Sequence, residues 1–272
     1  MSPLELPNFG PPDDKPMLPW YGGHYTHAFI ALSPFYVIDG LNPSVCETGN
    51  LILSRSNKPE EADLVEWVDA EAAKNKVGNE IESSSLDYIA RQYGKPVSWR
   101  TICREASFSD HCELDRALRT NIKGLRRDLE DKASAQRLLA HCSRNQIFLP
   151  TEGRIEPVQQ SRLAEFLSQK GHIQIIAGDE FGDEDLVIDT QSLLQPEPWD
   201  YRDDMPKFGI RRLMALDQSL LIWVHWDSFY VTIFGNEHSL ASANVGRFLE
   251  GFWCSPESTT YWLTQEAIAL VD

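Results

Sequence analysis

The stretch Ser219–Gly235, SLLIWVHWDSFYVTIFG, holds residues whose types and spacing could do chemistry. A histidine and an aspartate stand two positions apart in it, at His225 and Asp227. An imidazole beside a carboxylate can act as a general base or bind a metal ion. The residues on both sides are aromatic or β-branched and surround an Asp-Ser pair, which predicts a β-hairpin with a two-residue turn.

The register of this hairpin follows from placing Asp227 and Ser228 in the turn. The predicted cross-strand pairs are Trp226–Phe229, Val224–Val231 and Ile222–Ile233. The face that carries these six residues is entirely apolar. The other face is mixed and carries Leu221, Trp223, His225, Tyr230, Thr232 and Phe234. His225 therefore lies on the mixed face and Asp227 lies in the bend, where an aspartate commonly bonds nearby backbone N–H groups.

We interpret His225 and Asp227 as parts of the architecture and predict no catalytic residues. Trp223, His225 and Tyr230 are the candidates on the mixed face for contact with a ligand or a partner protein. A sheet with two apolar faces usually packs against other elements on both faces. Burial beneath a helix is therefore the preferred interpretation of this face, and ligand binding is the alternative.

Metal-binding and cofactor-binding patterns are weak in this chain. His24-x-x-His27 offers two ligands of the three or four that zinc needs, and Cys46 is the one nearby reinforcement. The acidic run 179–185 lacks the later positions of a calcium loop. The sequence has no GxGxxG, GxxxxGK[ST], GxSxG or HExxH motif. We predict no metal and no cofactor, and lean against an enzyme.

A predicted helix that starts at Asp110 offers a nucleic-acid alternative. Its apolar stripe comprises Leu114, Leu118, Ile122, Leu125 and Leu129. Arg116, Arg119 and Lys123 lie away from that stripe, and a preceding helix, Trp99–Ala106, gives the pair a helix-turn-helix-like order. The chain's net charge of −16 would repel phosphate, so we disfavour nucleic-acid binding.

The negative charge is concentrated in the last hundred residues. Residues 172–272 hold 17 acidic and five basic residues, a net −12, whereas residues 51–171 hold 19 of each. The remaining −4 comes from residues 1–50, with five acidic residues and one basic residue. A field of this sign attracts a basic protein partner, although it also serves solubility.

Several features predict a cytoplasmic protein. No window approaches the roughly 18 uninterrupted apolar residues of a membrane span, and the N-terminus has no secretion-signal pattern. The five cysteines are odd in number and widely spaced, which favours free thiols in a reducing compartment. We therefore expect no membrane partner.

The pattern of elements predicts an α+β fold. Helical periodicity predominates up to about residue 170, and strands mixed with helices follow. We expect an irregular proline-rich arm with edge segments in 1–50, a helical subdomain in 51–156 and an α/β subdomain in 157–272 that contains the hairpin 219–235. The three parts could also form one compact domain.

The individual elements are predicted from periodicity and caps. Predicted helices are a segment from Pro59, Leu86–Tyr93, Trp99–Ala106, a long helix from Asp110, Val158–Gln169, Ser239–Glu250 and a short helix from Ser255. Predicted strands besides the hairpin are His27–Ile38, interrupted by Pro34, then Asn50–Ser54, His172–Ala177 and Leu186–Ile188.

Five stretches together resemble the YwbB-like family of bacterial proteins of unknown function. They are PVSWRTICREASF (96–108), ALRTNIKGLRRDL (117–129), FLPTEGRIEPV (148–158), WVHWDSFYVTIFG (223–235) and EGFWCSPESTTYW (250–262). The resemblance covers roughly residues 90–262. It implies a bacterial cytoplasmic protein and brings no established activity. Polar residues in or beside these stretches are candidate site residues, namely Thr151, Glu152, Arg154, Asp227 and Glu257.

Two main functional hypotheses follow. The first is a non-enzymatic interaction or inhibitor protein, of the immunity type, whose acidic C-terminal surface binds a basic protein. The alternative is an enzyme or small-ligand-binding protein with a pocket between the helical and sheet parts. That pocket would use Trp223, His225 and Tyr230 beside Glu152 and Arg154.

Overall fold

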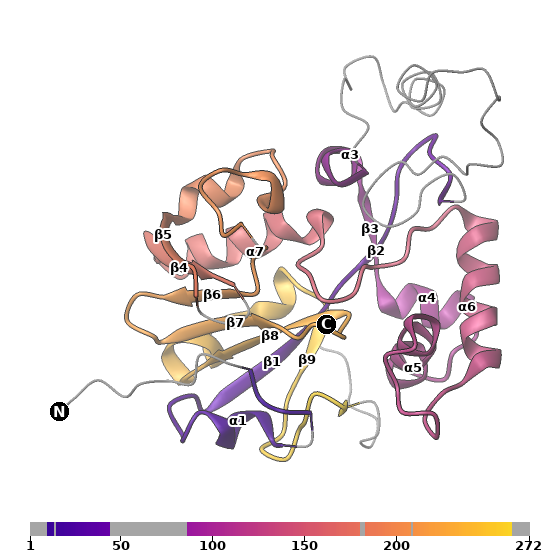
Figure 1. Cartoon of the computed structure of the whole chain (residues 1–272), viewed down its shortest axis with the longest axis horizontal. Coiled ribbons are helices and arrows are strands. Elements are labelled where there is room, and N and C mark those ends of the chain that lie inside the picture. Colours follow the sequence, from indigo (N-terminus) through magenta and orange to yellow (C-terminus); the bar gives the residue numbers. More distant parts are fainter. Residues whose placement is uncertain (1–9, 14, 44–85, 180–182, 208, 263–272) are drawn as a thin grey trace.

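A seven-stranded sheet forms the centre of the protein, in the order β5-β4-β6-β7-β8-β1-β9 (Figure 1). The computed structural model describes residues 10–13, 15–43, 86–179, 183–207 and 209–262. Every pairing in the sheet is antiparallel. The strands are β1 His27–Leu32, β4 Gln174–Gly178, β5 Asp185–Asp189, β6 Arg212–Ala215, β7 Leu220–Val224, β8 Tyr230–Gly235 and β9 Gly251–Trp253. Strands β2 (Phe35–Val37) and β3 (Lys95–Val97) form a separate small sheet.

The hairpin of β7 and β8 has the predicted register. Val224 lies opposite Val231 and Ile222 lies opposite Ile233. The predicted pairing of Trp226 with Phe229 is wrong, because the strands stop at Val224 and Tyr230. Ser228 closes the loop early, since both its N–H and its hydroxyl donate to the His225 carbonyl.

This early closure separates the two aromatic residues of the loop. Phe229 turns to the mixed face and packs with Trp223 and Tyr230, whereas Trp226 is 58% exposed. Neither residue therefore lies on the apolar face as predicted.

Both faces of the sheet are covered. Helix α7 (Pro157–Gln169) packs on the face that carries Ile222 and Val231. Helices α1 (Met17–Trp20), α4 (Trp99–Glu105), α5 (His111–Ile122) and α6 (Lys132–Asn145) pack on the face that carries Trp223 and Tyr230. Helix α3 (Leu86–Tyr93) contacts α7. This arrangement confirms the α+β fold.

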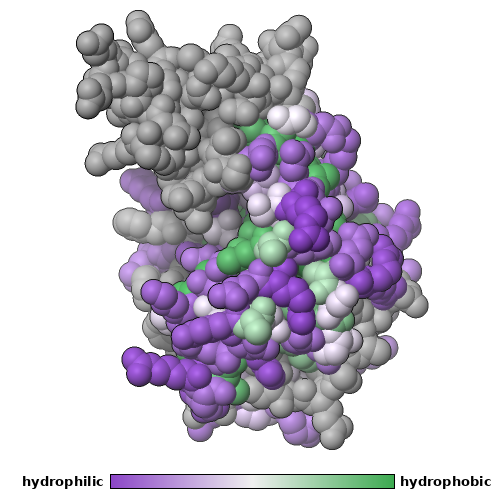
Figure 2. Space-filling view, turned by 90° about the vertical axis from the view of Figure 1, so that its right-hand side faces the viewer, coloured by the Kyte–Doolittle hydropathy of each residue, from purple (hydrophilic) through white to green (hydrophobic). Residues whose placement is uncertain are grey.

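On the side of the molecule formed by α4, α5 and α6, apolar side chains face the core. The face of the molecule that includes this side is mainly hydrophilic, with smaller hydrophobic areas between the polar residues (Figure 2). No helix in the described ranges has both the length and the apolar character that a membrane crossing requires.

The N-terminal segment supplies an interior strand and not an edge segment. Strand β1 pairs with β8 on one side and with β9 on the other. Pro34 ends β1 as predicted, and the chain then enters the small sheet at Phe35. The expected three-part division of the chain stays a prediction, with this strand as a link between the first and last parts.

Several predicted helices agree with the structure. Helix α3 has the predicted bounds. Ser98 caps α4 by accepting the Thr101 N–H, and Asp110 caps α5 by accepting the Glu113 N–H. Helix α5 does not continue to Leu129, however. It ends at Ile122 because Lys123 adopts a left-handed conformation with φ 62°.

Helical predictions near the C-terminus are wrong in type. An α-helix was expected at 239–250, but the chain forms a short π-helix at Glu237–Ala241 and a 3-10 helix at Val245–Arg247. Asn236 starts the wide turn by accepting the Ala241 N–H across five residues. Residues 255–261 form turns and irregular segments where the start of a short helix was expected. The predicted segments at 50–54 and from Pro59 lie outside the described residues.

Candidate functional site: a cavity beside the hairpin loop

A cavity of about 220 Å³ lies between α5, the segment 148–152 and the hairpin loop. Its apolar lining includes Leu118, Phe148 and Phe229, and its polar lining includes Asp87, Asn121, Thr151 and Glu152. Sites for drug-sized molecules span roughly 300–1,000 Å³. The cavity is therefore large enough for a smaller organic molecule.

One wall of the cavity is a fixed aromatic pair. The rings of Tyr36 and Phe148 are stacked, with centroids 4.9 Å apart and planes 5° from parallel. The two residues also exchange backbone hydrogen bonds of 3.2 Å and 2.8 Å. Because backbone and rings hold each other, this wall is pre-formed for a ligand.

Asp87 of α3 is a charged wall residue whose charge is already balanced. Its Oδ2 lies 3.0 Å from Nη2 of Arg154 and accepts a hydrogen bond of 2.8 Å from the Tyr201 hydroxyl. The same Arg154 nitrogen lies 2.8 Å from Asp200. The Asp87 carboxylate is therefore held in place and has little charge left for a ligand.

Glu156 lies behind the cavity wall and is 1% exposed. Its carboxyl group accepts the N–H of Thr151, a lining residue. Burial outweighs the attraction of Arg154 and raises the pKa of Glu156 to about 7. This carboxyl group can therefore gain or lose a proton near neutral pH.

Glu152 supplies the free charge of the cavity. It is exposed, and within the described part of the chain it has no hydrogen bond or ion pair. The neighbouring Gly153, at φ +65°, fixes this segment by donating its N–H to Ser228 O at 2.8 Å. A Cβ on Gly153 would lie 2.2 Å from the Trp226 carbonyl, so only glycine fits this contact.

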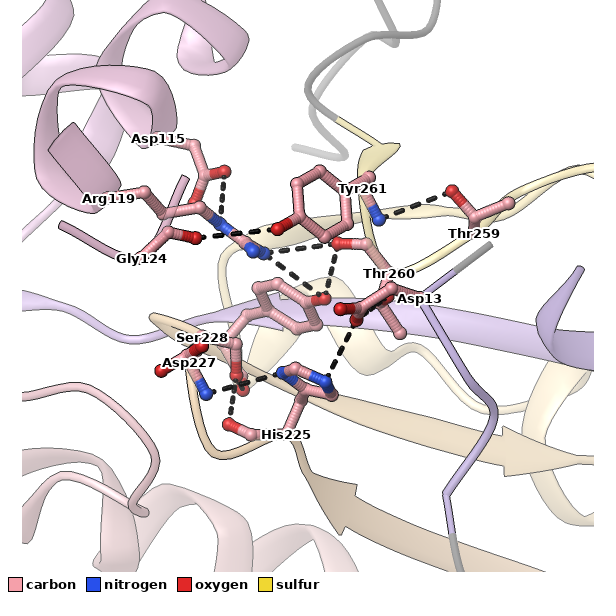
Figure 3. A network of polar contacts seen from close by, with 11 residues as sticks. Asp13, Asp115, Arg119, Gly124, His225, Asp227, Ser228, Thr259, Thr260 and Tyr261 are labelled. Carbon is pink, nitrogen blue, oxygen red and sulfur yellow. Dashed lines mark hydrogen bonds and ion pairs between the residues drawn. The ribbon is translucent and has the colours of Figure 1, made fainter. Parts of the chain in front are cut away.

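His225 is buried and belongs to a polar network on the other side of the loop, which reaches solvent at Asp13 (Figure 3). Its Nε2 lies 3.0 Å from Asp13 Oδ1, and its Nδ1 accepts the Asp227 N–H at 3.3 Å. Thr260 donates its hydroxyl to the same Asp13 oxygen at 2.7 Å. The His225 hydrogen bond lowers the pKa of Asp13. Both ring nitrogens of His225 are therefore occupied, and the Asp227 carboxylate is not their partner.

The network continues into the core through Thr260. Its carbonyl accepts hydrogen bonds from the Tyr230 hydroxyl at 2.9 Å and from Arg119 at 3.1 Å. Arg119 Nε lies 2.9 Å from Asp115, and both side chains are fully buried. The network thus joins α5, the hairpin loop, the N-terminal segment at Asp13 and the C-terminal segment at Thr260.

The structure divides the predicted site residues. Thr151 and Glu152 line the cavity, and Arg154 lies behind it, bound to Asp87. Trp223, His225 and Tyr230 are buried in the packed core and do not line the cavity.

The two remaining predicted site residues are carboxylates outside the cavity lining. Asp227 lies beside the His225 ring, and partial burial raises its pKa. Glu257 lies in an exposed turn, where its N–H donates to Ser255.

The basic helix face expected of a nucleic-acid binder is interrupted. Arg119 was predicted on that face, but it is fully buried against Asp115 and Tyr230. Arg119 is buried because α5 packs against the rest of the protein with more of its surface than the stripe of leucines. Among the three predicted phosphate contacts, Lys123 is exposed and Arg116 is half-buried.

The two histidines of the weak metal pattern contact other groups, and His27 Nε2 lies 3.5 Å from Glu237. Within the described ranges, no group of three or more His, Cys, Asp or Glu residues is arranged to hold a metal ion. His24 Nε2 contacts the Gln218 carbonyl at 2.9 Å. Cys46 lies outside those ranges, and the four described cysteines are free thiols.

Sequence reasoning missed Asp87, Glu156, Asp200 and Tyr201. Asp87 and Asp200 are 113 positions apart in the sequence (200 minus 87), and Arg154 joins them. Their local sequence contains no motif that marks them. The nearby Glu-Gly-Arg, residues 152–154, was the one local signal for this region.

Comparison with known proteins gives a family and no activity. Residues 13–264 match the family described as "Protein of unknown function (DUF2711)". No curated protein and no solved structure matches the chain. The narrower YwbB-like resemblance stays a prediction. Because the family model spans 252 residues (13–264) of 272, the chain belongs to the DUF2711 family of proteins of unknown function.

Proposed function

We propose that this protein binds a small organic cation in the cavity beside the hairpin loop. The observation that carries the proposal is the Glu152 carboxylate, which has no bonding partner among the described residues and lies at a cavity with apolar and aromatic walls. A carboxylate at such a site favours an ammonium group, and the apolar lining favours a hydrocarbon body.

A second cavity of about 200 Å³ offers a useful comparison. It is lined by Pro34, Phe248 and Glu250, among others. The Glu250 carboxylate already accepts the N–H groups of Trp99 and Arg100, at 2.7 Å and 3.0 Å, and so caps helix α4. Its charge is used within the fold, whereas that of Glu152 is available to a ligand.

The arrangement supports binding more than it supports a reaction. Glu156 has a pKa suited to proton transfer, but it is sealed behind Thr151. General acid–base catalysis needs the carboxyl group within hydrogen-bond reach of the substrate. We therefore propose a ligand-binding protein and assign no catalytic residue.

Three probes with the same ring and differing head groups test this proposal. 2-Phenylethylammonium, 2-phenylethanol and phenylacetate each have about ten non-hydrogen atoms, and binding is measured by calorimetry and protein NMR. A ligand of this size is expected to bind with a Kd of about 1 mM. The cation should bind, the alcohol should bind several-fold more weakly and the anion should not bind.

Glu152→Gln should weaken binding of the cation about three- to five-fold and leave the alcohol unchanged, because an exposed charge contributes less than about 1 kcal/mol. Glu165→Gln on α7 removes the same charge outside the cavity lining and serves as the control. Equal binding of the cation by wild type and Glu152→Gln would refute the proposal.

A second candidate function is binding of a basic protein, as an interaction or inhibitor protein of the immunity type in a bacterial cytoplasm. The net −12 of residues 172–272 supports this candidate, as do exposed apolar residues in the same part, including Ile173 at 78% and Trp226. Purification from the native host should then yield a basic protein that dissociates as salt rises from 50 to 500 mM. Recovery of the protein alone at low salt would count against it.

A further inference from the structure

The cavity beside the hairpin loop has a buried aromatic part and an exposed polar part. Tyr36, Phe148 and Phe229 line it and are 5%, 5% and 2% exposed. Asn121 and Glu152 also line it, but both are exposed. Since buried residues form the inner wall of an open cavity and exposed residues form its rim, the rings lie deeper than the Glu152 carboxylate. We call the three aromatic residues the floor of the cavity, and Asn121 with Glu152 its mouth.

The floor combines rings from separate parts of the fold. Tyr36 of β2 and Phe148 form the stacked pair, in which each ring covers only one face of the other. Phe229 adds a third ring from the hairpin loop. The face of an aromatic ring attracts a cation, and several rings around one cavity are the arrangement that recognises quaternary ammonium ions. The floor can therefore attract a charged head group as well as a hydrocarbon.

The two carboxylates of the lining differ in what they can offer such a head group. One oxygen of Asp87 contacts Arg154 and accepts the Tyr201 hydroxyl, and Arg154 balances the Asp87 charge. Glu152 has no bonding partner among the described residues and lies at the mouth. A cation on the floor would thus meet the rings on one side and an unbalanced carboxylate on the side of the solvent.

Hydration distinguishes a quaternary from a primary ammonium group at this site. A primary ammonium is a compact, strongly hydrated charge with three N–H donors, and each donor needs an acceptor when it leaves water. In a quaternary ammonium, carbon groups replace these donors and need no acceptor. Nine of the thirteen described residues that line the cavity are apolar or aromatic, so the lining matches methyl groups better than N–H groups.

We infer that the cavity prefers a small quaternary ammonium ion, of the type that choline represents, over a primary ammonium ion. The methylated head group would lie on the floor against the three rings, and Glu152 would balance its charge from the mouth. Choline is smaller than 2-phenylethylammonium, so the same cavity admits it. This inference rests on the proposed function and adds the class of cation that the cavity selects.

Three probes that share a hydroxyethyl group test the inference by calorimetry and protein NMR. Choline has the quaternary head group, ethanolamine has the primary one, and 3,3-dimethylbutan-1-ol has the shape of choline with a neutral carbon in place of nitrogen. We expect choline to bind about five-fold more tightly than either of the others, because it alone combines charge with methyl surface. The methyl protons of bound choline should show nuclear Overhauser contacts with the rings of Phe148 and Phe229. Choline that binds no more tightly than ethanolamine, or that contacts other rings only, would overturn the inference.

A matched pair of phenylalanine substitutions shows whether the rings cause the preference. Phe148→Leu removes one ring of the floor and keeps an apolar side chain. Choline should then bind about five-fold more weakly, while 3,3-dimethylbutan-1-ol stays within about two-fold of its wild-type affinity. Phe166→Leu is the control, because Phe166 is buried on α7 outside the cavity lining, and it should change neither affinity.

Both probes are measured on each variant, so a general loss of packing would weaken them alike. Such a parallel loss in Phe148→Leu would overturn the inference. The comparison of the three probes on the wild-type protein decides the inference even where Phe148→Leu does not fold.

The outcomes also separate this inference from the proposed function. If 2-phenylethylammonium binds in a manner that depends on Glu152, but choline binds no better than ethanolamine, the inference fails and the proposed function stands. If neither choline nor 2-phenylethylammonium binds, both fail. Choline binding that Glu152→Gln weakens about three-fold would support both, since an exposed carboxylate contributes modestly to the affinity for a cation.

Discussion

Arg119 and Arg154 are both bound to aspartates, but their surroundings differ. Arg119 has no exposed surface and shares its network with Tyr230 and Thr260 in the packed core. Arg154 has a side chain that is 18% exposed, and its partner Asp87 lines a cavity. The same types of residue thus form a closed ion pair at Arg119 in the core and an open network beside Glu152.

This difference shows why residue type does not identify a site. A fully buried pair such as Asp115 and Arg119 can specify a fold, but a ligand cannot reach it. A network at a cavity can hold its own charges and still leave one free, as at Glu152. Matched substitutions in the two networks test this difference.

The largest effect is expected from Arg119→Ala. This change leaves Asp115 in the core without its partner, and loss of one partner of a buried ion pair costs about 3–5 kcal/mol. Arg154→Ala should cost about 1–2 kcal/mol, because Asp87 keeps the Tyr201 hydroxyl and is nearer to solvent. Urea unfolding measures both losses, and equal losses would contradict the distinction between a closed and an open network.

A paired substitution controls for loss of packing at Arg119. The double variant Asp115→Leu/Arg119→Met replaces both charges by apolar side chains of similar size. It should recover most of the stability that Arg119→Ala loses, since an apolar pair often matches a buried ion pair. A double variant as unstable as Arg119→Ala would show that lost packing, and not the stranded carboxylate, dominates.

The second effect concerns pH and the open network. The pKa of Glu156 is about 7 in the folded state and about 4.5 when unfolded. Between these values the folded state holds a proton that the unfolded state has lost, so the free energy of unfolding falls as pH rises from about 4.5 to 7. The expected loss is about 3 kcal/mol.

Glu156→Gln should remove this decline, because the amide keeps an acceptor for the Thr151 N–H without a charge. Unfolding free energies measured by urea from pH 4.5 to 8 test this, with Glu165→Gln as the charge-matched control. Parallel pH profiles for wild type and Glu156→Gln would contradict the raised pKa.

Parts of the fold that depend on local chemistry could be predicted from the sequence. Ser98 and Asp110 cap their helices, and the alternation from Ile222 to Ile233 fixes the hairpin register. The apolar stripe of α5 also predicted buried residues correctly, including Leu125 beyond the end of the helix.

Other parts depend on contacts between distant residues and gave no local signal. The end of α5 depends on one left-handed residue, Lys123, which nothing in the leucine spacing indicates. The partner of His225 is Asp13, 212 positions earlier in the sequence (225 minus 13), and not the adjacent Asp227. Similarly, Asp87 becomes a cavity residue only when α3 packs beside the segment that follows α6.

A third prediction concerns Gly153, where the two regions meet. Gly153→Ala places a methyl group against the Trp226 carbonyl and strains a positive φ, so we expect a loss of about 2 kcal/mol. Gly171→Ala is the control, because φ is +79° there but the space around it is open, and it should cost about 1 kcal/mol. Thermal unfolding compares the two. An equal loss in both variants would show that the contact between Gly153 and the hairpin loop is not tight.

The smallest expected effect isolates the hydrogen bond between His225 and Asp13. Each single substitution, His225→Ala or Asp13→Ala, should cost about 1 kcal/mol or slightly more, because each leaves a polar partner without its bond. The double variant should then lose less than the sum of the two, with a coupling free energy of about 0.5–1 kcal/mol. Urea unfolding of all four proteins at pH 7 measures this coupling.

Affinity for the cation probe shows whether His225 also contributes to ligand binding. His225→Ala should leave affinity for 2-phenylethylammonium within two-fold of wild type, because the imidazole faces Asp13 and does not line the cavity. Glu152→Gln should change that affinity and leave stability unchanged. A His225 variant that keeps its stability but loses the probe would place the imidazole in the binding site and merge the two regions into one.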